Sequence, residues 1–196
     1  MGIALNALTQ NMAWLQLGEQ LKKYQDFTPY PLALILVIYA QATAATAAIG
    51  ILVLTFGELL RIFSKAHQEK HNGNNPNNGI ITSGTYALVK NPIYLGNFLI
   101  FFGLAIYSGD LAVVTIFGSL YAANYLLIIN YEEGLTAGAI DPCYKLYLDK
   151  TPAFIPKRLP NLDDFSTNLY IKKSVESEQG YFLLLGFMIM LLTVAS

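Results

Sequence analysis

The chain has 196 residues, of which 54% are hydrophobic and 13% are charged, a balance far from that of most globular domains. Its formal net charge is -1 and no block of like charge occurs, which gives no support for binding nucleic acid or an acidic polymer. The single cysteine, Cys143, excludes an intramolecular disulfide and a C-x-x-C metal or redox pair. The composition predicts an all-α integral membrane protein.

The N-terminal segment combines polar and apolar residues. It has no early basic residue and no continuous apolar stretch before a small-residue cleavage site, so we expect no cleaved signal peptide. Residues 13–24 place Trp14 and Leu17 at near-helical spacing and end with Lys22 and Lys23. This pattern predicts an amphipathic helix that lies in the membrane interface.

The first long apolar stretch, residues 30–63, is too long for one pass through a membrane. A helix of this length would span about 50 Å, whereas the hydrocarbon core is about 30 Å thick. The polar patch at residues 41–46 predicts a turn, which divides the stretch into a hairpin of residues 27–40 and 47–63. Small residues near the turn, such as Gly50, would let the two short arms pack closely together.

The rest of the chain alternates polar connectors with apolar blocks. We expect a cytoplasmic connector over 64–91, a second helical hairpin over 92–131, a cytoplasmic segment over 132–179 and a C-terminal span over 180–196. This last block is also short enough to be a half-buried anchor. The sequence therefore predicts one domain of about five transmembrane helices. The Asn- and Gly-rich tip at residues 71–79 is not expected to carry function.

The basic residues predict which side of the membrane each connector faces. Threading the five expected spans alternately places all 12 Lys and Arg residues on one side. The turns near Gln41 and Gly109, on the other side, hold none. Because basic residues collect in cytoplasmic loops, we expect the connectors and any site that they form to face the cytoplasm.

The first polar cluster precedes the second hairpin and reads G-T-Y-A-L-V-K-N-P-I-Y-L-G-N over residues 84–97. Pro92 is favourable in the first turn of a helix, and Asn91 before it is a good N-cap. Such a helix would point its free amides and positive dipole end at the membrane boundary, where a carboxylate or phosphate could bind. The alternative is a capped helix start with interfacial tyrosines and no ligand.

The second polar cluster begins with Glu132 and Glu133, directly after the second hairpin, and continues with Tyr144, Tyr147 and T-P-A-F-I-P over residues 151–156. Neighbouring positions on a helix diverge by about 100°, so the two carboxylates cannot act as one face-to-face acid/base pair. An acid at the membrane boundary favours a cationic ligand. A solvated helix end would have the same sequence, so both interpretations stay open.

Taken in order, these clusters resemble the membrane methyltransferase family that includes isoprenylcysteine carboxyl methyltransferases and phospholipid methyltransferases. The family pattern has G-x-Y-x-x-x-R-H-P-x-Y-x-G opening one span, E-E closing the next, and Y-x-x-Y-x-x-x-x-P-x-F-I-P after it. This chain has G-T-Y-A-L-V-K-N-P-I-Y-L-G, E-E and Y-K-L-Y-L-D-K-T-P-A-F-I-P in the same order, over about residues 50–160. The stretch G-E-L-L-R at residues 57–61 also looks like the end of the preceding family span.

The resemblance implies S-adenosylmethionine as the cofactor, bound on the cytoplasmic side, and no metal. It implies a lipophilic or membrane-embedded acceptor, such as an isoprenylcysteine carboxylate, a lipid or a small hydrophobic molecule, and it names no catalytic residue. Whether S, N or O is methylated does not follow from the sequence. The residues that the resemblance places at the cofactor are Tyr86, Val89, Lys90, Asn91, Pro92, Tyr94, Gly96, Glu132, Glu133, Tyr144 and Tyr147.

One departure from the family pattern affects the expected site. The family's Arg-His is Lys90-Asn91 here, so a bidentate arginine clamp and any role for imidazole titration are lost. Two other functions stay open: an NADPH-dependent sterol-type reductase, whose C-terminal region is similar, and a non-catalytic membrane protein that retains the fold. His67 and His71 are spaced i, i+4, but without a third ligand nearby we expect a solvated pair and no metal site.

Overall fold

The computed structural model describes residues 14–25, 29–74, 81–137, 142–165 and 170–196. Within these ranges the regular structure is helical and contains no strand, which confirms the expected all-α class. Residues 14–23 form a helical segment that precedes the labelled elements. The labelled elements are α2 (Pro29–Ile38), α3 (Ala44–Asn74), η1 (Gly84–Ala87), α4 (Pro92–Ser108), α5 (Leu111–Ala137), α6 (Pro142–Lys150), η2 (Leu162–Phe165), α7 (Ile171–Ser177) and α8 (Gln179–Ala195).

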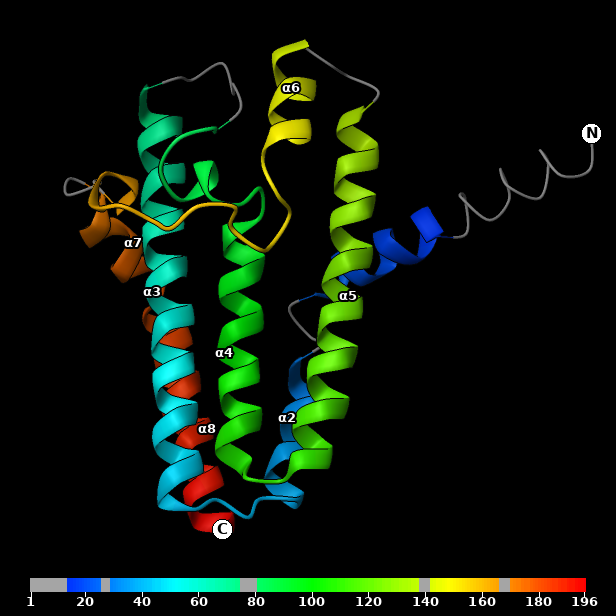
Figure 1. The fold of residues 1–196 in the computed structure, drawn as a ribbon. Helices are drawn as coiled ribbons and strands as arrows, with labels where there is room; N and C mark the ends of the chain where they lie inside the picture. The colour runs from blue at the N-terminus through cyan, green and yellow to red at the C-terminus, as the bar shows by residue number, and fades with distance from the viewer. Residues whose placement is uncertain (1–13, 26–28, 75–80, 138–141, 166–169) are drawn as a thin grey trace, which may run out of the picture.

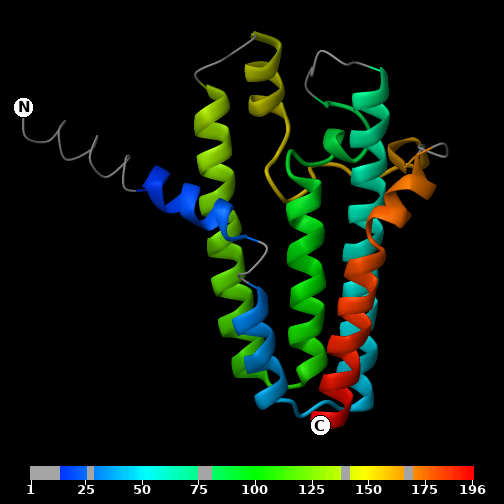
Figure 2. The same ribbon diagram turned by 180° about the vertical axis from the view of Figure 1, so that it is seen from behind.

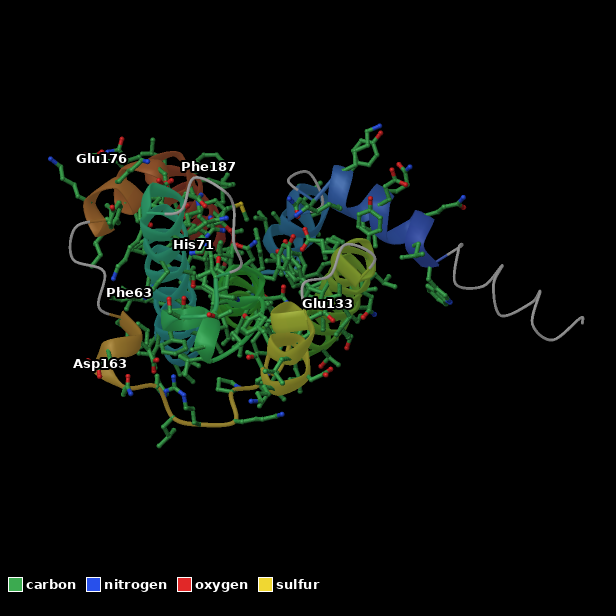
Figure 3. The ribbon with its side chains drawn as sticks, turned by 90° about the horizontal axis from the view of Figure 1, so that it is seen from above. Phe63, His71, Glu133, Asp163, Glu176 and Phe187 are labelled. Carbon is green, nitrogen blue, oxygen red and sulfur yellow. The ribbon has the colours of Figure 1, made fainter. Side chains whose placement is uncertain are left out.

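The long helices form an antiparallel bundle. Figures 1 and 2 show α2, α3, α4, α5 and α8 running along one common direction. The elements η1, α6, η2 and α7 collect at one end of the bundle, which we call the connector end. The turns at residues 39–43 and 109–110 lie at the opposite, outer end. Figure 3 looks onto the connector end, where Glu133 lies in the last part of α5 and Asp163 belongs to η2.

The expectation of about five full spans is not confirmed. Two helices are long and apolar enough to cross a membrane, at residues 44–73 and 111–133, and α7 with α8, which meet at a 54° bend, would make a third. Helix α4 has 17 residues and α2 has 10, whereas a straight pass needs about 20. Apolar side chains on α3 face outward, with Leu52 72% exposed, as contact with lipid requires. The described residues thus hold two or three spans by length and composition.

Helix α3 extends beyond Phe63, where we expected the first hairpin to end, and continues to Asn74. Its polar part pairs with α7, where Lys173 donates to Glu69, and just before Phe63 the Ser174 hydroxyl of α7 donates a hydrogen bond of 2.8 Å to the Ile62 carbonyl. The prediction of a solvated histidine pair is wrong for His67, which is only 6% exposed. The His67 ring fills the space beside Gly84, whose φ of 64° and lack of a Cβ make room for it.

The first hairpin also packs differently from our expectation. Helix α2 packs mainly against α8, α4 and α5, and α3 packs against α4. Gly50 and Gly57 of α3 face Gly103 and Gly96 of α4: a Cβ at Gly50 would lie 2.6 Å from the Gly103 carbonyl oxygen. The seven-residue spacing on both helices keeps these glycines on one face, so the two backbones touch. The small residues do bring helices together, but the partner of α3 is α4.

The outer end of the bundle is closed by paired polar groups. The Gln41 amide donates a hydrogen bond of 2.6 Å to the Ser108 carbonyl, which ties the loop before α3 to the end of α4. Gly109 follows with φ 82°, and a Cβ there would overlap the Gln41 carbonyl group. The Asp110 carboxylate then accepts the Val113 amide at 2.9 Å and caps α5.

Candidate functional site

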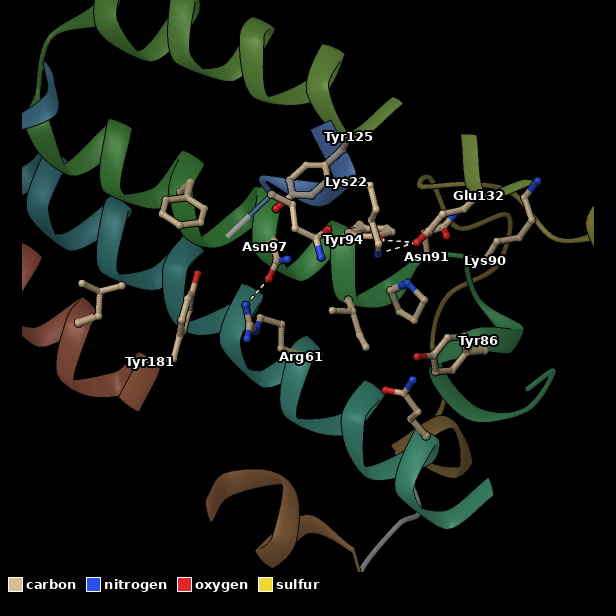
Figure 4. Close-up of a pocket in the computed structure, with 16 residues that line it drawn as sticks. Lys22, Arg61, Tyr86, Lys90, Asn91, Tyr94, Asn97, Tyr125, Glu132 and Tyr181 are labelled. Carbon is tan, nitrogen blue, oxygen red and sulfur yellow. Dashed lines mark hydrogen bonds and ion pairs between the residues drawn. The ribbon is translucent and has the colours of Figure 1, made fainter. Parts of the chain in front are cut away.

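A cavity of about 640 Å³ opens at the connector end, between the helical segment 14–23 and helices α3, α4, α5 and α8 (Figure 4). Its volume falls in the range of about 300–1000 Å³ that small-molecule sites occupy. The wall includes six of the residues that the sequence placed at a cofactor: Tyr86, Lys90, Asn91, Pro92, Tyr94 and Glu132. The two polar clusters of the sequence therefore meet around one cavity, at one end of the bundle.

Two further residues of the predicted site support this wall from behind. The Tyr147 hydroxyl donates a hydrogen bond of 2.9 Å to the Tyr86 carbonyl, which holds η1 against α6. Glu133 pairs with the Lys90 ammonium at 2.7 Å, and the Lys90 amide donates to the Pro152 carbonyl at 2.8 Å. The stretch before α4 is thus fixed from both α5 and the tail after α6.

Two other predicted site residues, Val89 and Gly96, lie away from the cavity. Val89 is buried, with 1% of its surface exposed, between η1 and α4. Gly96 faces α3, where a Cβ would lie 2.9 Å from the Gly57 carbonyl oxygen, so its role is close helix packing. The side chain of Tyr144 lies outside the described part of the chain.

The start of α4 leaves a polar group at the cavity. Pro92 occupies the first turn and Asn91 the N-cap position, as expected, but the Asn91 side chain makes no capping hydrogen bond. Its Nδ2 atom is buried and has no hydrogen-bond partner among the described residues. Nearby, burial raises the pKa of the Tyr86 phenol, which keeps it protonated at neutral pH. The wall therefore presents an unpaired amide donor and a neutral phenol beside the positive end of the α4 dipole.

The more exposed side of the cavity, which we call the mouth, is formed by Lys22, Tyr94 and Glu132 (Figure 4). The Lys22 ammonium lies 2.6 Å from a Glu132 carboxylate oxygen, and 35% of each side chain is exposed. Lys22 also donates a hydrogen bond to the Tyr94 hydroxyl, which in turn donates to Glu132 at 2.9 Å. The mouth thus contains one cation held by a carboxylate and a phenol.

The buried side of the cavity, which we call the inner end, is organised around Arg61. One guanidinium nitrogen donates to both carboxylate oxygens of Glu178, at 2.9 and 2.8 Å, and another donates to the Asn97 side chain. The guanidinium also stacks on the Tyr181 ring, 4.1 Å from its centroid. Arg61 and Glu178 expose only 9% and 2% of their side chains. The inner end is therefore polar but closed to bulk water.

Aromatic side chains line the rest of the inner end. Phe101 of α4 and Tyr125 of α5 border the cavity, together with Tyr181 and Leu184 of α8. The Tyr181 hydroxyl is buried and has no hydrogen-bond partner in the described ranges. The inner end can thus bind an apolar or aromatic group and offer it one phenolic hydrogen bond.

Several cavity residues were not identified from the sequence: Lys22, Gln25, Arg61, Gln68, Ile93, Asn97, Phe101, Tyr125, Tyr181 and Leu184. Lys22 was used only to mark the end of an amphipathic helix and the sidedness of the membrane, and Tyr181 only fell within the expected C-terminal span. Arg61 carried a usable signal, because a charged residue at the end of an apolar stretch needs a partner. Among the described residues, no three His, Cys, Asp or Glu side chains come together as metal ligands.

Comparison with known proteins gives the family. The family model for phospholipid methyltransferases matches residues 31–139, more than half of the chain. The chain belongs to the phospholipid methyltransferase family. This membership confirms the resemblance that the ordered motifs indicated. The family match includes α2, α3, α4 and α5 but not the segment that carries Lys22 or the helix that carries Tyr181.

Two curated relatives are both named as metal-resistance proteins. The cobalt-zinc-cadmium resistance protein CzcN of Cupriavidus metallidurans is 36% identical over 81 residues, which are 41% of this chain and 37% of the relative. The nickel-cobalt-cadmium resistance protein NccN of Alcaligenes xylosoxydans xylosoxydans is 24% identical over 115 residues, 59% of this chain and 52% of the relative. The chain thus matches about half or less of the length of each. No solved structure matches it significantly.

Proposed function

We propose that the chain is an integral membrane methyltransferase that uses S-adenosylmethionine and acts on a lipophilic acceptor held at the membrane. One observation carries the proposal: Asn91 and Tyr94 at the start of α4 and Glu132 near the end of α5 line one cavity. These are the positions where the family pattern opens one span and closes the next. Family membership supports methyl transfer, and two or three apolar helices support a place in the membrane.

The cavity fits the chemical groups of the cofactor. S-adenosylmethionine combines a carboxylate, an ammonium, a positively charged sulfonium and a nucleoside. The dipole at the start of α4 and the Asn91 amide, which has no partner among the described residues, suit a carboxylate or a ribose hydroxyl. Glu132 suits a positive group, and the rings of Phe101 and Tyr125 suit a flat base.

The reaction needs alignment and exclusion of water more than it needs an acid or a metal. When bound, the cofactor would supply an electrophilic methyl group, and a lone pair of the acceptor would bond to the methyl carbon as the methyl–sulfur bond breaks. The electron pair of that bond would go to sulfur to give a neutral thioether, and any proton carried by the acceptor nucleophile would leave to water. The chain contributes an inner end closed by Phe101, Tyr125 and Tyr181, and a mouth open to water at Glu132.

The distribution of charge supports an active site on the cytoplasmic side. The turns at residues 39–43 and 109–110 at the outer end hold no Lys or Arg. Arg61, Lys65 and Lys90 form ion pairs toward the connector end. Because basic segments stay in the cytoplasm, the water-soluble cofactor would enter the cavity from there and the acceptor from the lipid.

Calorimetry with S-adenosylhomocysteine tests the proposal on purified protein in detergent. The wild type should bind this product of the cofactor, and Glu132→Gln should weaken binding about tenfold, as expected for a lost charge-assisted hydrogen bond. Asp163→Asn, which removes an exposed acid on η2, is the matched control and should bind as the wild type does. Absence of heat from the wild type at millimolar ligand would refute the proposal.

The acceptor can be sought without assuming its identity. Membrane lipid extract incubated with the protein and methyl-labelled cofactor should yield a product that carries the label, detected by mass spectrometry. The Glu132→Gln variant should give much less of it. A labelled product that forms equally without the protein would remove the support for a membrane acceptor.

A further inference from the structure

We propose that Glu132 and Tyr94 form a subsite for an alkylammonium group, and that Lys22 fills this subsite until the amino-acid end of the methyl donor displaces it. This inference rests on the proposed function and extends it. It assigns to the helical segment 14–23, which lies outside the family match, a direct contact with the cofactor site. Lys22 would act as a built-in competitor of the cofactor.

The geometry around the Lys22 ammonium is that of a bound ligand. Its nitrogen lies 2.6 Å from a carboxylate oxygen of Glu132 and donates a hydrogen bond to the Tyr94 hydroxyl. The same nitrogen lies 5.1 Å from the centroid of the Tyr94 ring. A carboxylate, a phenol oxygen and an aromatic ring are the groups that bind a primary ammonium well. The ammonium of an amino acid presents the same donors as that of lysine.

The other cations at the cavity are committed to other acids. Arg61 is bound by Glu178, and Lys90 by Glu133. Glu132 is therefore the acid at the mouth whose charge is balanced by Lys22. Displacing Lys22 by another ammonium keeps this balance, so the exchange leaves no uncompensated charge in the cavity.

The Lys22–Glu132 pair is partly exposed and the segment 14–23 lies at the edge of the bundle, so little free energy is needed to displace Lys22. The side chains of Lys22 and Glu132 are each 35% exposed, and ion pairs that are this open to water contribute little to stability. The helical segment contacts α5 through Gly18, where a Cβ would lie 2.6 Å from the Tyr131 Cβ. Figures 1 and 2 show the segment beside α5 and outside the bundle of long helices. Its withdrawal would remove Leu21 from the edge of the core but would leave the contacts between the long helices in place.

Removing the competing ammonium should therefore tighten cofactor binding. In calorimetry, Lys22→Met should bind S-adenosylhomocysteine about two- to fivefold more tightly than the wild type, the range expected for a partly exposed ion pair. Lys23→Met is the matched control, since Lys23 is exposed and lies over the Tyr24 ring instead of in the cavity. It should bind as the wild type does.

Two further measurements separate competition from a general effect of charge. Methylthioadenosine has the same nucleoside and a thioether but no amino-acid group, so its affinity should be the same in Lys22→Met and the wild type. Gly18→Leu keeps Lys22 but forces the segment away from α5, so it should tighten the binding of S-adenosylhomocysteine as Lys22→Met does. Trp14 lies on this segment and is the only tryptophan, so its fluorescence should change when S-adenosylhomocysteine binds the wild type.

The outcomes distinguish this inference from the proposed function. Tighter S-adenosylhomocysteine binding in Lys22→Met, with methylthioadenosine unchanged, supports it. Weaker binding in Lys22→Met would overturn it, because Lys22 would then be a ligand of the donor, and equal binding would overturn it as well. If neither protein binds S-adenosylhomocysteine, the proposed function fails and this inference fails with it.

Discussion

Two ion pairs border the same cavity, and their surroundings differ. At the inner end, Arg61 and Glu178 expose 9% and 2% of their side chains, and Glu178 also accepts Lys65 at 2.6 Å. At the mouth, Lys22 and Glu132 each expose 35%. The inner pair is fixed by several partners, whereas the mouth pair can be solvated by water on one side.

The difference suggests separate roles for the two pairs. A charge left alone in a buried site costs several kcal/mol, so the inner pair holds α3 to the bend between α7 and α8. A partly exposed pair costs little to break, so its carboxylate is available to a ligand. On the proposed function, burial more than residue identity would separate the structural acid Glu178 from the ligand-binding acid Glu132.

The largest expected effect is on the inner pair. Arg61→Met leaves Glu178 buried with Lys65 as its remaining cation, and we expect the free energy of unfolding to fall by about 3–5 kcal/mol. Denaturant unfolding in detergent, followed by circular dichroism, measures this change. Lys172→Met, at a side chain that is 88% exposed, should leave stability unchanged. Wild-type stability of Arg61→Met would show that the inner pair is not structural.

An intermediate effect is expected at the pair behind the cavity wall. Lys90 and Glu133 expose 13% and 30% of their side chains, between the values for the other two pairs. Lys90→Met should therefore lower the free energy of unfolding by about 1–2 kcal/mol in the same measurement. A loss as large as that of Arg61→Met would break the relation between burial and stability.

The mouth pair should contribute least to folding among the cavity pairs. Glu132→Gln should change the free energy of unfolding by less than about 1 kcal/mol, although it weakens ligand binding. Unfolding and calorimetry on the same preparation compare the two effects directly. If stability and affinity fell together by a similar free energy, Glu132 would be a structural acid like Glu178.

The smallest effect concerns an ion pair far from the bundle core and depends on pH. Hydrogen bonds from Arg158, at 2.6 and 2.7 Å, lower the pKa of the Asp164 carboxyl on η2. A carboxyl with a lowered pKa stabilises the folded state above its ordinary pKa, and this contribution is lost as the pH falls through the folded value. Between about pH 6 and pH 3, Tm should therefore fall slightly more for the wild type than for Asp164→Asn. Equal slopes would show that the pair does not stabilise the fold.

Much of the helix order could be predicted from the sequence. Apolar blocks separated by polar connectors gave the five long helices, and Pro92 and Gly109 marked the two ends of α4. The number of full spans is not confirmed, because composition shows that a block is apolar but not where its helix begins and ends. Helix α2 illustrates this, since only Pro29–Ile38 are helical.

The candidate site was only partly predictable. Motif positions such as Asn91 and Glu132 line the cavity because they end apolar blocks at the same end of the bundle. Lys22 and Tyr181 reach it through tertiary packing of segments that lie more than 40 residues away in sequence from both Asn91 and Glu132. A local sequence pattern does not predict such packing. For the same reason, the glycines of α3 did not predict that their partner helix is α4.

Helices α3 and α4 touch at two glycine pairs, Gly50 with Gly103 and Gly57 with Gly96, and this contact limits where a molecule can enter the bundle. Where two helix backbones touch along two turns and more, no hydrocarbon chain can slide between them. A molecule that enters from the lipid cannot therefore pass between α3 and α4. On the proposed function, a lipophilic acceptor would have to enter the bundle at a place other than the contact between α3 and α4.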